Sequence, residues 1–293
     1  MGEKDITEKT LEAYNDVFSD IVNGLLFQGK QLVQEQTLTD AQPVSMYKAD
    51  GGIHEQERDV SKYWARTEWD RINVRIAFLG MENQTGYDRD MPLRVIGYDG
   101  ASYRAELSQD DRYPVVTLVL YFGDKPWGKN RSLFDVVSIP EELKPFASDY
   151  RINVFEIARL PEEAIGYFHS DFKVVVDYFV RKRTEPEYRP KDPEKFRHVD
   201  ELLKLMSVLT EDRRFEEALE GKGGKPKDMC EVLDRVEARG EARGVKKGRQ
   251  EGVDETRLES IKNIMETLKL TAQQAMEALR IPDGERPKYA ARL

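Results

Sequence analysis

The sequence predicts an α/β fold in which a mixed central sheet is flanked by helices and followed by an all-helical C-terminal extension. Apolar side chains recur at three- and four-residue spacing in residues 11–25, which is the pattern of an amphipathic helix. Residues 60–68 and 72–80 are rich in β-branched and aromatic side chains and are expected to form two antiparallel strands. Residues 115–122 are almost entirely apolar, as is typical of a strand at the centre of a sheet.

Weaker patterns describe the rest of the first two thirds of the chain. Residues 34–57 are polar and interrupted by proline and glycine, which indicates a loop. Residues 92–107 are expected to form a helix with Pro92 in its first turn. A further strand is expected over residues 151–157, followed by a helix over residues 161–183.

The composition changes at residues 181–193, where three prolines stand among charged side chains. Only helical patterns follow, over residues 199–220, 230–268 and 271–280. We therefore expect three parts, which are a sheet-containing domain over 1–185, a linker and helix over 186–230, and a helical C-terminal region over 231–293.

The overall composition restricts the class of protein. The chain has 293 residues, a net charge of −9 and no apolar stretch near the length of about 18 residues that a transmembrane helix needs. Residues 1–9 are charged and lack the apolar core of a secretory signal. The single cysteine, Cys230, excludes an internal disulfide and a cysteine-based zinc site. These features favour a cytoplasmic protein without a membrane partner.

Positive charge is concentrated in one segment of this acidic chain. Residues 221–250 contain nine Lys and Arg against five Asp and Glu, a net charge of +4. Glycine recurs at every fourth position from Gly240 to Gly252, although each glycine costs roughly 1 kcal/mol in a helix. A DNA backbone or a second copy of the helix could pack there; a solvated, ion-paired face and a flexible connector are the alternatives. The candidate DNA-binding side chains are Arg239, Arg243, Lys246, Lys247 and Arg249.

The end of the chain carries its own helix signals. Thr271 is a suitable N-cap, and Gln274 completes a capping box with it. Together with residues 260–268, the helix that starts there could form a helix-turn-helix or a plain helical hairpin that packs or dimerises.

The two predicted antiparallel strands bring together two acidic residues. Paired residues in an antiparallel hairpin have numbers that add to a constant, and a turn near Asp70-Arg71 sets that constant at 141. Asp59 and Glu82 satisfy it, so we expect their carboxylates to lie side by side. Alternation along the strand then places Gln84 on the same face as Glu82.

Adjacent carboxylates repel each other unless a cation lies between them. Hard oxygen ligands of this kind suit Mg²⁺ or Mn²⁺, which would lower the pKa of a bound water and stabilise charge on a phosphoryl oxygen. The sequence therefore favours Asp59 and Glu82 as metal ligands, with Gln84 orienting the attacking water by a hydrogen bond. Carboxylates near strand ends are also common without any catalytic role.

Several segments resemble the recombination-promoting nuclease family, also described as transposase-like, of the PD-(D/E)XK nucleases. The most specific is Leu79-Gly-Met-Glu-Asn-Gln-Thr followed by Met91-Pro-Leu-Arg-Val-Ile-Gly-Tyr, an apolar strand ending in E-x-Q and then M-P-x-R-x-x-x-Y. Further similar segments are Asn15-Asp-Val-Phe, Pro114-Val-Val-Thr-Leu-Val-Leu-Tyr-Phe-Gly-Asp-Lys-Pro-Trp, Tyr150-Arg-Ile-Asn-Val and Phe168-His-Ser-Asp.

The resemblance implies a restriction-endonuclease-like core and a nucleoid-associated hydrolase, an endonuclease that cuts DNA with a divalent metal and promotes recombination. It implies Asp59 and Glu82 as the two acids of the motif and Gln84 where a lysine is usual. Asp16 matches an acid that can approach the site from the N-terminal helix. Arg94 and Tyr98, one helical turn apart, could contact a phosphate or brace Glu82.

A second hypothesis is a weakly active or inactive DNA-binding or oligomerising protein on a decayed nuclease core. Gln84 favours it, as does Ser19, which stands where a lysine often follows phenylalanine in this family. Retention of both acids opposes it. For either hypothesis we expect DNA as a partner and a homo-oligomer, a dimer formed through the C-terminal helices.

Overall fold

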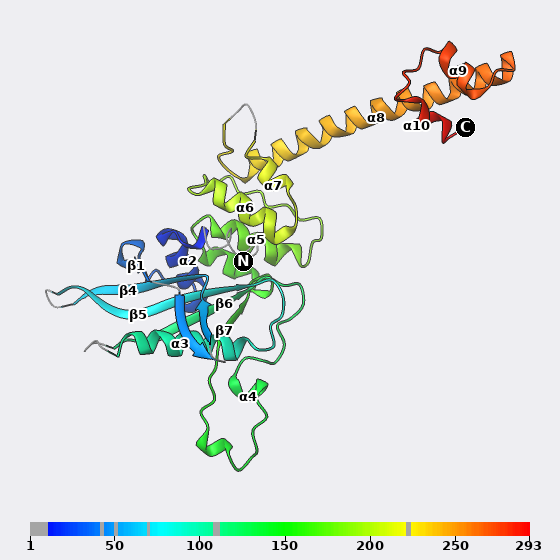
Figure 1. The fold of residues 1–293 in the computed structure, drawn as a ribbon. Coiled ribbons are helices and arrows are strands. Elements are labelled where there is room, and N and C mark those ends of the chain that lie inside the picture. Colours follow the sequence, from blue (N-terminus) through cyan, green and yellow to red (C-terminus); the bar gives the residue numbers. More distant parts are fainter. Residues whose placement is uncertain (1–10, 42–43, 50–51, 69–70, 108–111, 221–223) are drawn as a thin grey trace. The chain divides into compact units, whose positions relative to one another are not determined.

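The computed structural model describes residues 11–41, 44–49, 52–68, 71–107, 112–220 and 224–293. The chain divides into two compact units, residues 1–233 and residues 234–293. The first contains the sheet and most of the helices, and the second is helical (Figure 1). Among the described residues, no helix is both long and apolar enough to cross a membrane.

The first unit is built on a mixed five-stranded sheet with the order β1-β4-β5-β6-β7. Strand β5 pairs antiparallel with β4 and parallel with β6, and β6 pairs parallel with β7. This confirms an α/β fold with a mixed sheet flanked by helices. The strands are β1 (Leu38–Asp40), β4 (Val60–Glu68), β5 (Arg71–Gln84), β6 (Val115–Tyr121) and β7 (Asn153–Glu156).

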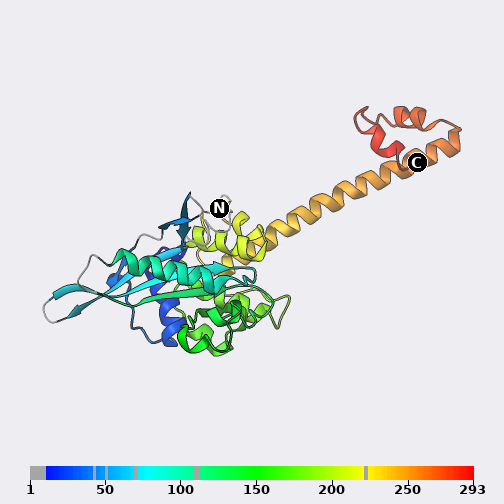
Figure 2. The same cartoon turned by 60° about the horizontal axis from the view of Figure 1, so that its bottom comes forward.

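Helices cover both faces of this sheet (Figures 1 and 2). Helix α3 lies on one face, where Met91 and Val95 pack with Val119 and Tyr121 of β6. Helices α2 and α5 lie on the other face, where the amino group of Lys62 in β4 lies 5.7 Å from the ring of Phe18 in α2. The helices of the first unit are α2 (Asn15–Phe27), α3 (Met91–Ala105), α4 (Leu133–Val136), α5 (Phe172–Lys182), α6 (Val199–Thr210) and α7 (Arg214–Glu217).

One expectation for the first half of the chain was wrong. Residues 34–57 are not a plain loop, because they contain a 3₁₀ turn η1 (Glu35–Thr37), strand β1 and the two-stranded sheet of β2 (Val44–Ala49) and β3 (Gly52–Glu57). These strands lack the apolar run that marks a buried strand, and β2 pairs only with β3 among the described strands.

The expected helix over residues 161–183 is in fact two elements. A 3₁₀ helix η4 (Glu162–Tyr167) is separated from α5 by residues 168–171. The carboxylate of Asp20 in α2 accepts hydrogen bonds from the backbone N–H groups of His169 and Ser170, which fixes this break. Residues 199–220 are likewise divided, into α6 and α7. The remaining 3₁₀ helices are η2 (Lys144–Phe146) and η3 (Ile157–Arg159).

The second unit contains most of helix α8 (Met229–Leu268), which confirms the helix expected over residues 230–268, together with α9 (Ala272–Ala278) and α10 (Arg286–Ala290). Thr271 caps α9 and forms the expected capping box with Gln274. The end of α8 shares a small core with α9, α10 and the residues between them. That core contains Ile261, Ala275, Met276, Ile281 and Tyr289. Helix α10 was not predicted from the sequence.

Candidate functional site

Strands β4 and β5 place Asp59 beside Glu82. Val60 pairs with Met81, so continuing the register by one residue brings Asp59 opposite Glu82. A carboxylate oxygen of Asp59, Oδ2, accepts the backbone N–H of Asn83 at 2.6 Å. The side chain of Asp59 is therefore held at the end of β5, next to the second acid.

The register agrees with the sequence arithmetic at this end of the hairpin and differs at the other. Pair numbers add to 141 from Val60–Met81 to Trp64–Ala77, but the closing pair is Glu68–Arg71, which adds to 139. Two register shifts, after Trp64 and after Arg66, account for the difference. The expected turn near Asp70-Arg71 lies partly outside the described residues.

Neighbouring side chains of β5 face opposite sides of the sheet. Glu82 faces α3 and is 2% exposed. Asn83 faces the other side, where its Nδ2 donates to Oε2 of the buried Glu12 at 2.9 Å. Glu12 lies in the helical turn before α2, and the sequence interpretation did not single it out, because a lone acid beside an apolar stripe carries no signal of burial.

Helix α3 brings a guanidinium group to Glu82. Nη2 of Arg94 donates a hydrogen bond to Oε1 of Glu82 and, at 3.1 Å, to the hydroxyl of Tyr98. Nη1 of Arg94 forms a second ion pair, 3.0 Å from Asp88. The Arg94 side chain remains 39% exposed, so this cation covers Glu82 from the solvent side.

The two acids shift the pKa values of Tyr98 and Arg94. Burial, Glu82 and Asp59 raise the pKa of Tyr98, although Arg94 opposes the shift. Burial alone would lower the pKa of Arg94, but Glu82, Tyr98 and Asp88 outweigh it and raise that pKa. Tyr98 is 3% exposed, so it faces the two carboxylates as a neutral hydroxyl.

Gln84 lies on the same face of β5 as Glu82, as alternation requires. Its Nε2 is 3.4 Å from Oε1 of Glu82, a long and therefore weak hydrogen bond. Gln84 is half-buried, and its amide can turn toward a water or a phosphate at the edge of the site.

The residue before Asp59 anchors the site to the core. Arg58 is 1% exposed and donates to Asp99 at 2.5 Å and to Ser102 at 2.8 Å, both on α3. Burial lowers the pKa of Arg58, and the charge of Asp99 counteracts that shift. The guanidinium crosses β5 at Gly80, where an added Cβ would lie 2.7 Å from Cδ of Arg58. Only glycine at position 80 leaves room for the Arg58 side chain.

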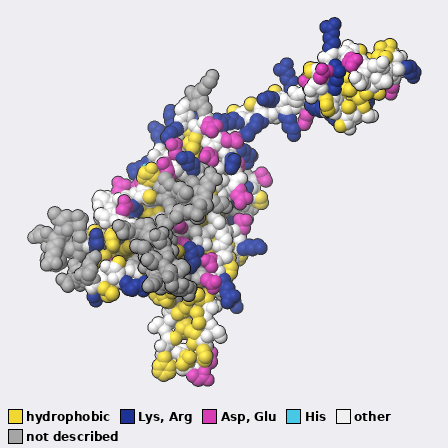
Figure 3. Space-filling model, viewed as in Figure 1, with side chains coloured by type: hydrophobic (Ala, Val, Ile, Leu, Met, Phe, Trp, Pro, Cys, Tyr) yellow, Lys and Arg dark blue, Asp and Glu magenta, His cyan; other side chains and the backbone are white. Residues whose placement is uncertain are grey.

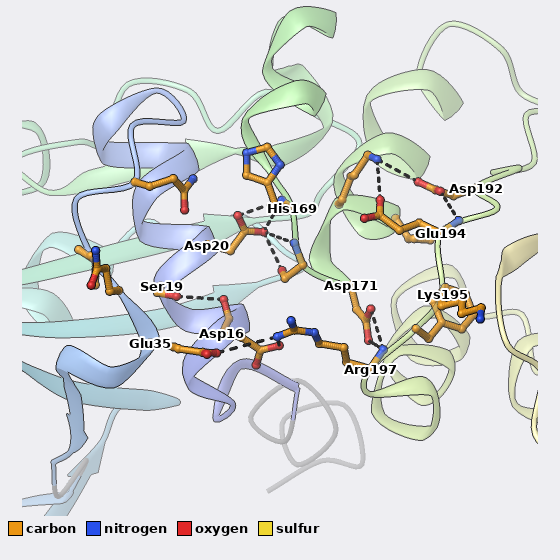
Figure 4. Close-up of a pocket in the computed structure, with 17 residues that line it drawn as sticks. Asp16, Ser19, Asp20, Glu35, His169, Asp171, Asp192, Glu194, Lys195 and Arg197 are labelled. Atoms are coloured by element: carbon orange, nitrogen blue, oxygen red, sulfur yellow. Dashed lines mark hydrogen bonds and ion pairs between the residues drawn. The ribbon is translucent and has the colours of Figure 1, made fainter.

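The structure places Asp16 in a different cleft, on the α2 side of the sheet (Figure 4). Its carboxylate lies 3.0 Å from Nε2 of His198 and 3.3 Å from Nη1 of Arg197, which also approaches Glu35. Ser19 donates to the backbone carbonyl of Asp16 at 3.1 Å. The cleft has a volume of about 370 Å³ and mixed charge, and its contacts tie the residues before α6 to α2.

The candidate DNA-binding side chains all lie on α8, where Lys and Arg side chains project along the helix (Figure 3). Arg239 is half-buried, and the other four are exposed. Lys247 approaches Glu251 at 3.7 Å, one turn further along the helix. The exposed members are Arg243, Lys246, Lys247 and Arg249.

No three His, Cys, Asp or Glu side chains in the described part of the chain gather in a metal-binding cluster. Asp59 and Glu82 together offer two carboxylates, which is the number that Mg²⁺ commonly takes from a protein while keeping its waters. The donor set therefore fits a hard divalent cation, provided that Arg94 leaves Glu82. A scan of protein-family models and searches of curated proteins and of solved structures found no match to this chain.

Proposed function

We propose that this protein is a metal-dependent DNA endonuclease with a restriction-endonuclease-like core. The observation that carries the proposal is the β4–β5 register, which sets Asp59 beside Glu82 with Gln84 on the Glu82 face. The mixed sheet with helices on both faces supports it, since the resemblance to the recombination-promoting nucleases implies such a core. We accordingly propose a transposase-like role that promotes recombination at the nucleoid.

In this proposal Asp59 and Glu82 hold Mg²⁺ or Mn²⁺. When bound, the metal supplies an acidic water and stabilises charge on the phosphate oxygens. Gln84 orients the attacking water through its amide. Arg94 turns from Glu82 toward the scissile phosphate and keeps its ion pair with Asp88. Its guanidinium also continues to donate a hydrogen bond to the neutral hydroxyl of Tyr98.

DNA is the proposed partner despite the net charge of −9. Contacts to phosphates depend on local charge, and the five candidate DNA-binding side chains of α8 supply it. A second copy of the chain is the other proposed partner, bound through the C-terminal helices.

A plasmid-nicking assay with Mg²⁺ tests the activity. Wild type should convert supercoiled plasmid to the nicked form, and chelation of the metal should stop it. Glu82→Gln should be inactive, because it keeps the shape of the side chain but removes the charge that holds the metal. Glu142→Gln, at an exposed position away from the two acids, is the matched control and should nick like wild type.

The competing proposal is a DNA-binding or oligomerising protein on a decayed nuclease core. Gln84 in place of lysine favours it, whereas the paired acids favour catalysis. Equal nicking by wild type and Glu82→Gln would show that Glu82 is not an active-site residue. DNA binding without metal-dependent nicking in the wild type would establish the decayed core instead.

A further inference from the structure

One face of α8 is exposed and apolar at its centre. Val245 is 73% exposed and Val253 is 40% exposed. Together with Ala238 and Ala242 they line a groove of about 700 Å³ along the helix. All of its lining residues belong to the second unit, so the face exists independently of how the two units are arranged.

These residues follow the spacing of a helix that packs along another helix. Ala238, Ala242, Val245, Arg249 and Val253 are separated by three or four positions and therefore share one face. Arg249 lies in line with the apolar residues, near the middle of the face. A charge at such a position requires an acidic partner when the face is covered.

The charges on this face are complementary to those of the same face on a second, antiparallel copy of the helix. Glu241 lies four residues before Val245, and Arg249 lies four residues after it. When two copies pair antiparallel about Val245, Glu241 of each copy meets Arg249 of the other. In an in-register parallel pair, Arg249, which lies near the middle of the face, would meet Arg249 of the other copy, which is repulsive.

Two features of the sequence disfavour this segment as a lone helix. Gly240 and Gly244 face open space, where an added Cβ would meet nothing within 4 Å. Glycine disfavours a helix interior, and the spacing of Glu237 with Glu241 places like charges one turn apart. Packing against a partner offsets both costs.

We propose that α8 binds a second copy of itself antiparallel over residues 238–253, with the two-fold axis near Val245. The pairing gives the proposed dimer a defined geometry and does not depend on whether the chain cuts DNA. Arg243 and Lys247 lie on another side of the helix and remain exposed to DNA in the dimer, whereas Arg249 is taken up by the interface.

A charge-swap series on the full chain tests the orientation. Glu241→Arg and Arg249→Glu should each weaken dimerisation by about tenfold or more in sedimentation equilibrium, because each creates two like-charge contacts. The double variant should return to within about threefold of wild type, since the pairs are restored with signs exchanged. Glu255→Lys, exposed on another side of α8, is the control and should dimerise normally.

Cysteine crosslinking provides an independent readout in a Cys230→Ser background. Glu241→Cys and Arg249→Cys chains should form a disulfide-linked dimer when mixed and oxidised, and neither should do so alone. Crosslinking of Arg249→Cys with itself would establish a parallel pair and overturn the proposal. A chain that stays monomeric, or a dimer unaffected by both single charge reversals, would overturn it as well, and loss of DNA binding in those variants would then assign the face to DNA.

Discussion

Oδ2 of Asp59 accepts the backbone N–H of Asn83 at 2.6 Å, so the first acid of the candidate site is fastened to the strand that carries the second. This bond gives Asp59 a structural role that can be separated from metal binding. An asparagine can keep the acceptor, whereas an alanine cannot.

We therefore predict different results for two substitutions of Asp59. Asp59→Asn should unfold in urea like wild type but fail to nick plasmid, because the negative charge is lost. Asp59→Ala should also be inactive and in addition less stable by about 1–3 kcal/mol, since the Asn83 N–H loses its acceptor. Equal stability of the two variants would show that the bond contributes little.

Arg94 should compete with the metal for Glu82. Arg94→Met keeps the apolar stem and removes the cation, so Mn²⁺ affinity should rise about tenfold by titration calorimetry without DNA. Nicking should nevertheless fall, because the proposed phosphate contact is lost. Arg104→Met, at an exposed position on the same helix, is the control. An unchanged Mn²⁺ affinity in Arg94→Met would contradict the competition.

Gln84 should limit the rate of cutting. A lysine at this position could donate to the attacking water or stabilise the transition state, so Gln84→Lys should nick about tenfold faster or more. Gln36→Lys adds the same charge at an exposed position and should leave the rate unchanged. A slower Gln84→Lys enzyme would indicate that the amide itself is required.

Gly80 should be intolerant of a side chain. A Cβ there would lie 2.7 Å from Cδ and 2.9 Å from Nε of Arg58, which is held in place by Asp99 and Ser102. Gly80→Ala should therefore lower the free energy of unfolding by about 1–3 kcal/mol in urea denaturation. Gly86→Ala, where a Cβ meets nothing within 4 Å, should cost much less.

Asp254 should make the second unit sensitive to acid. Its carboxylate accepts from Lys288, Tyr289 and Gln250, and these bonds, Lys288 first, lower its pKa below the ordinary value of 3.8. The stabilisation is therefore complete above pH 3.8 and is lost as the pH falls through the lowered pKa. Asp254→Asn should melt at a lower temperature than wild type at neutral pH, and the difference should vanish in strong acid. A difference that persists there would exclude the charge as its cause.

The sequence predicted the pairing of Asp59 with Glu82 better than it predicted the turn that produces it. The strands pair as expected from Val60–Met81 to Trp64–Ala77 because two register shifts separate these pairs from the closing pair Glu68–Arg71, whose numbers add to 139. Bulges of this kind depend on how neighbouring strands pack, and the periodicity of a single strand carries no information about that packing.

Other features escaped prediction for the same reason. The break before α5 is set by Asp20, about 150 residues earlier in the chain, and the buried Glu12 accepts a hydrogen bond from Asn83, about 70 residues later. Long apolar runs such as β6 were predicted correctly, since their burial is independent of any single distant partner.

Asp99 has a consequence for motion at the site. Its carboxylate accepts from Arg58 before β4, from Thr117 in β6 and from Tyr150 before β7. Four separated segments thus meet at one buried carboxylate, and moving any one of them away breaks at least one buried hydrogen bond. The end of the β4–β5 pair that carries Asp59 therefore opens only together with the core, so its amide protons should exchange with solvent as slowly as those of β6.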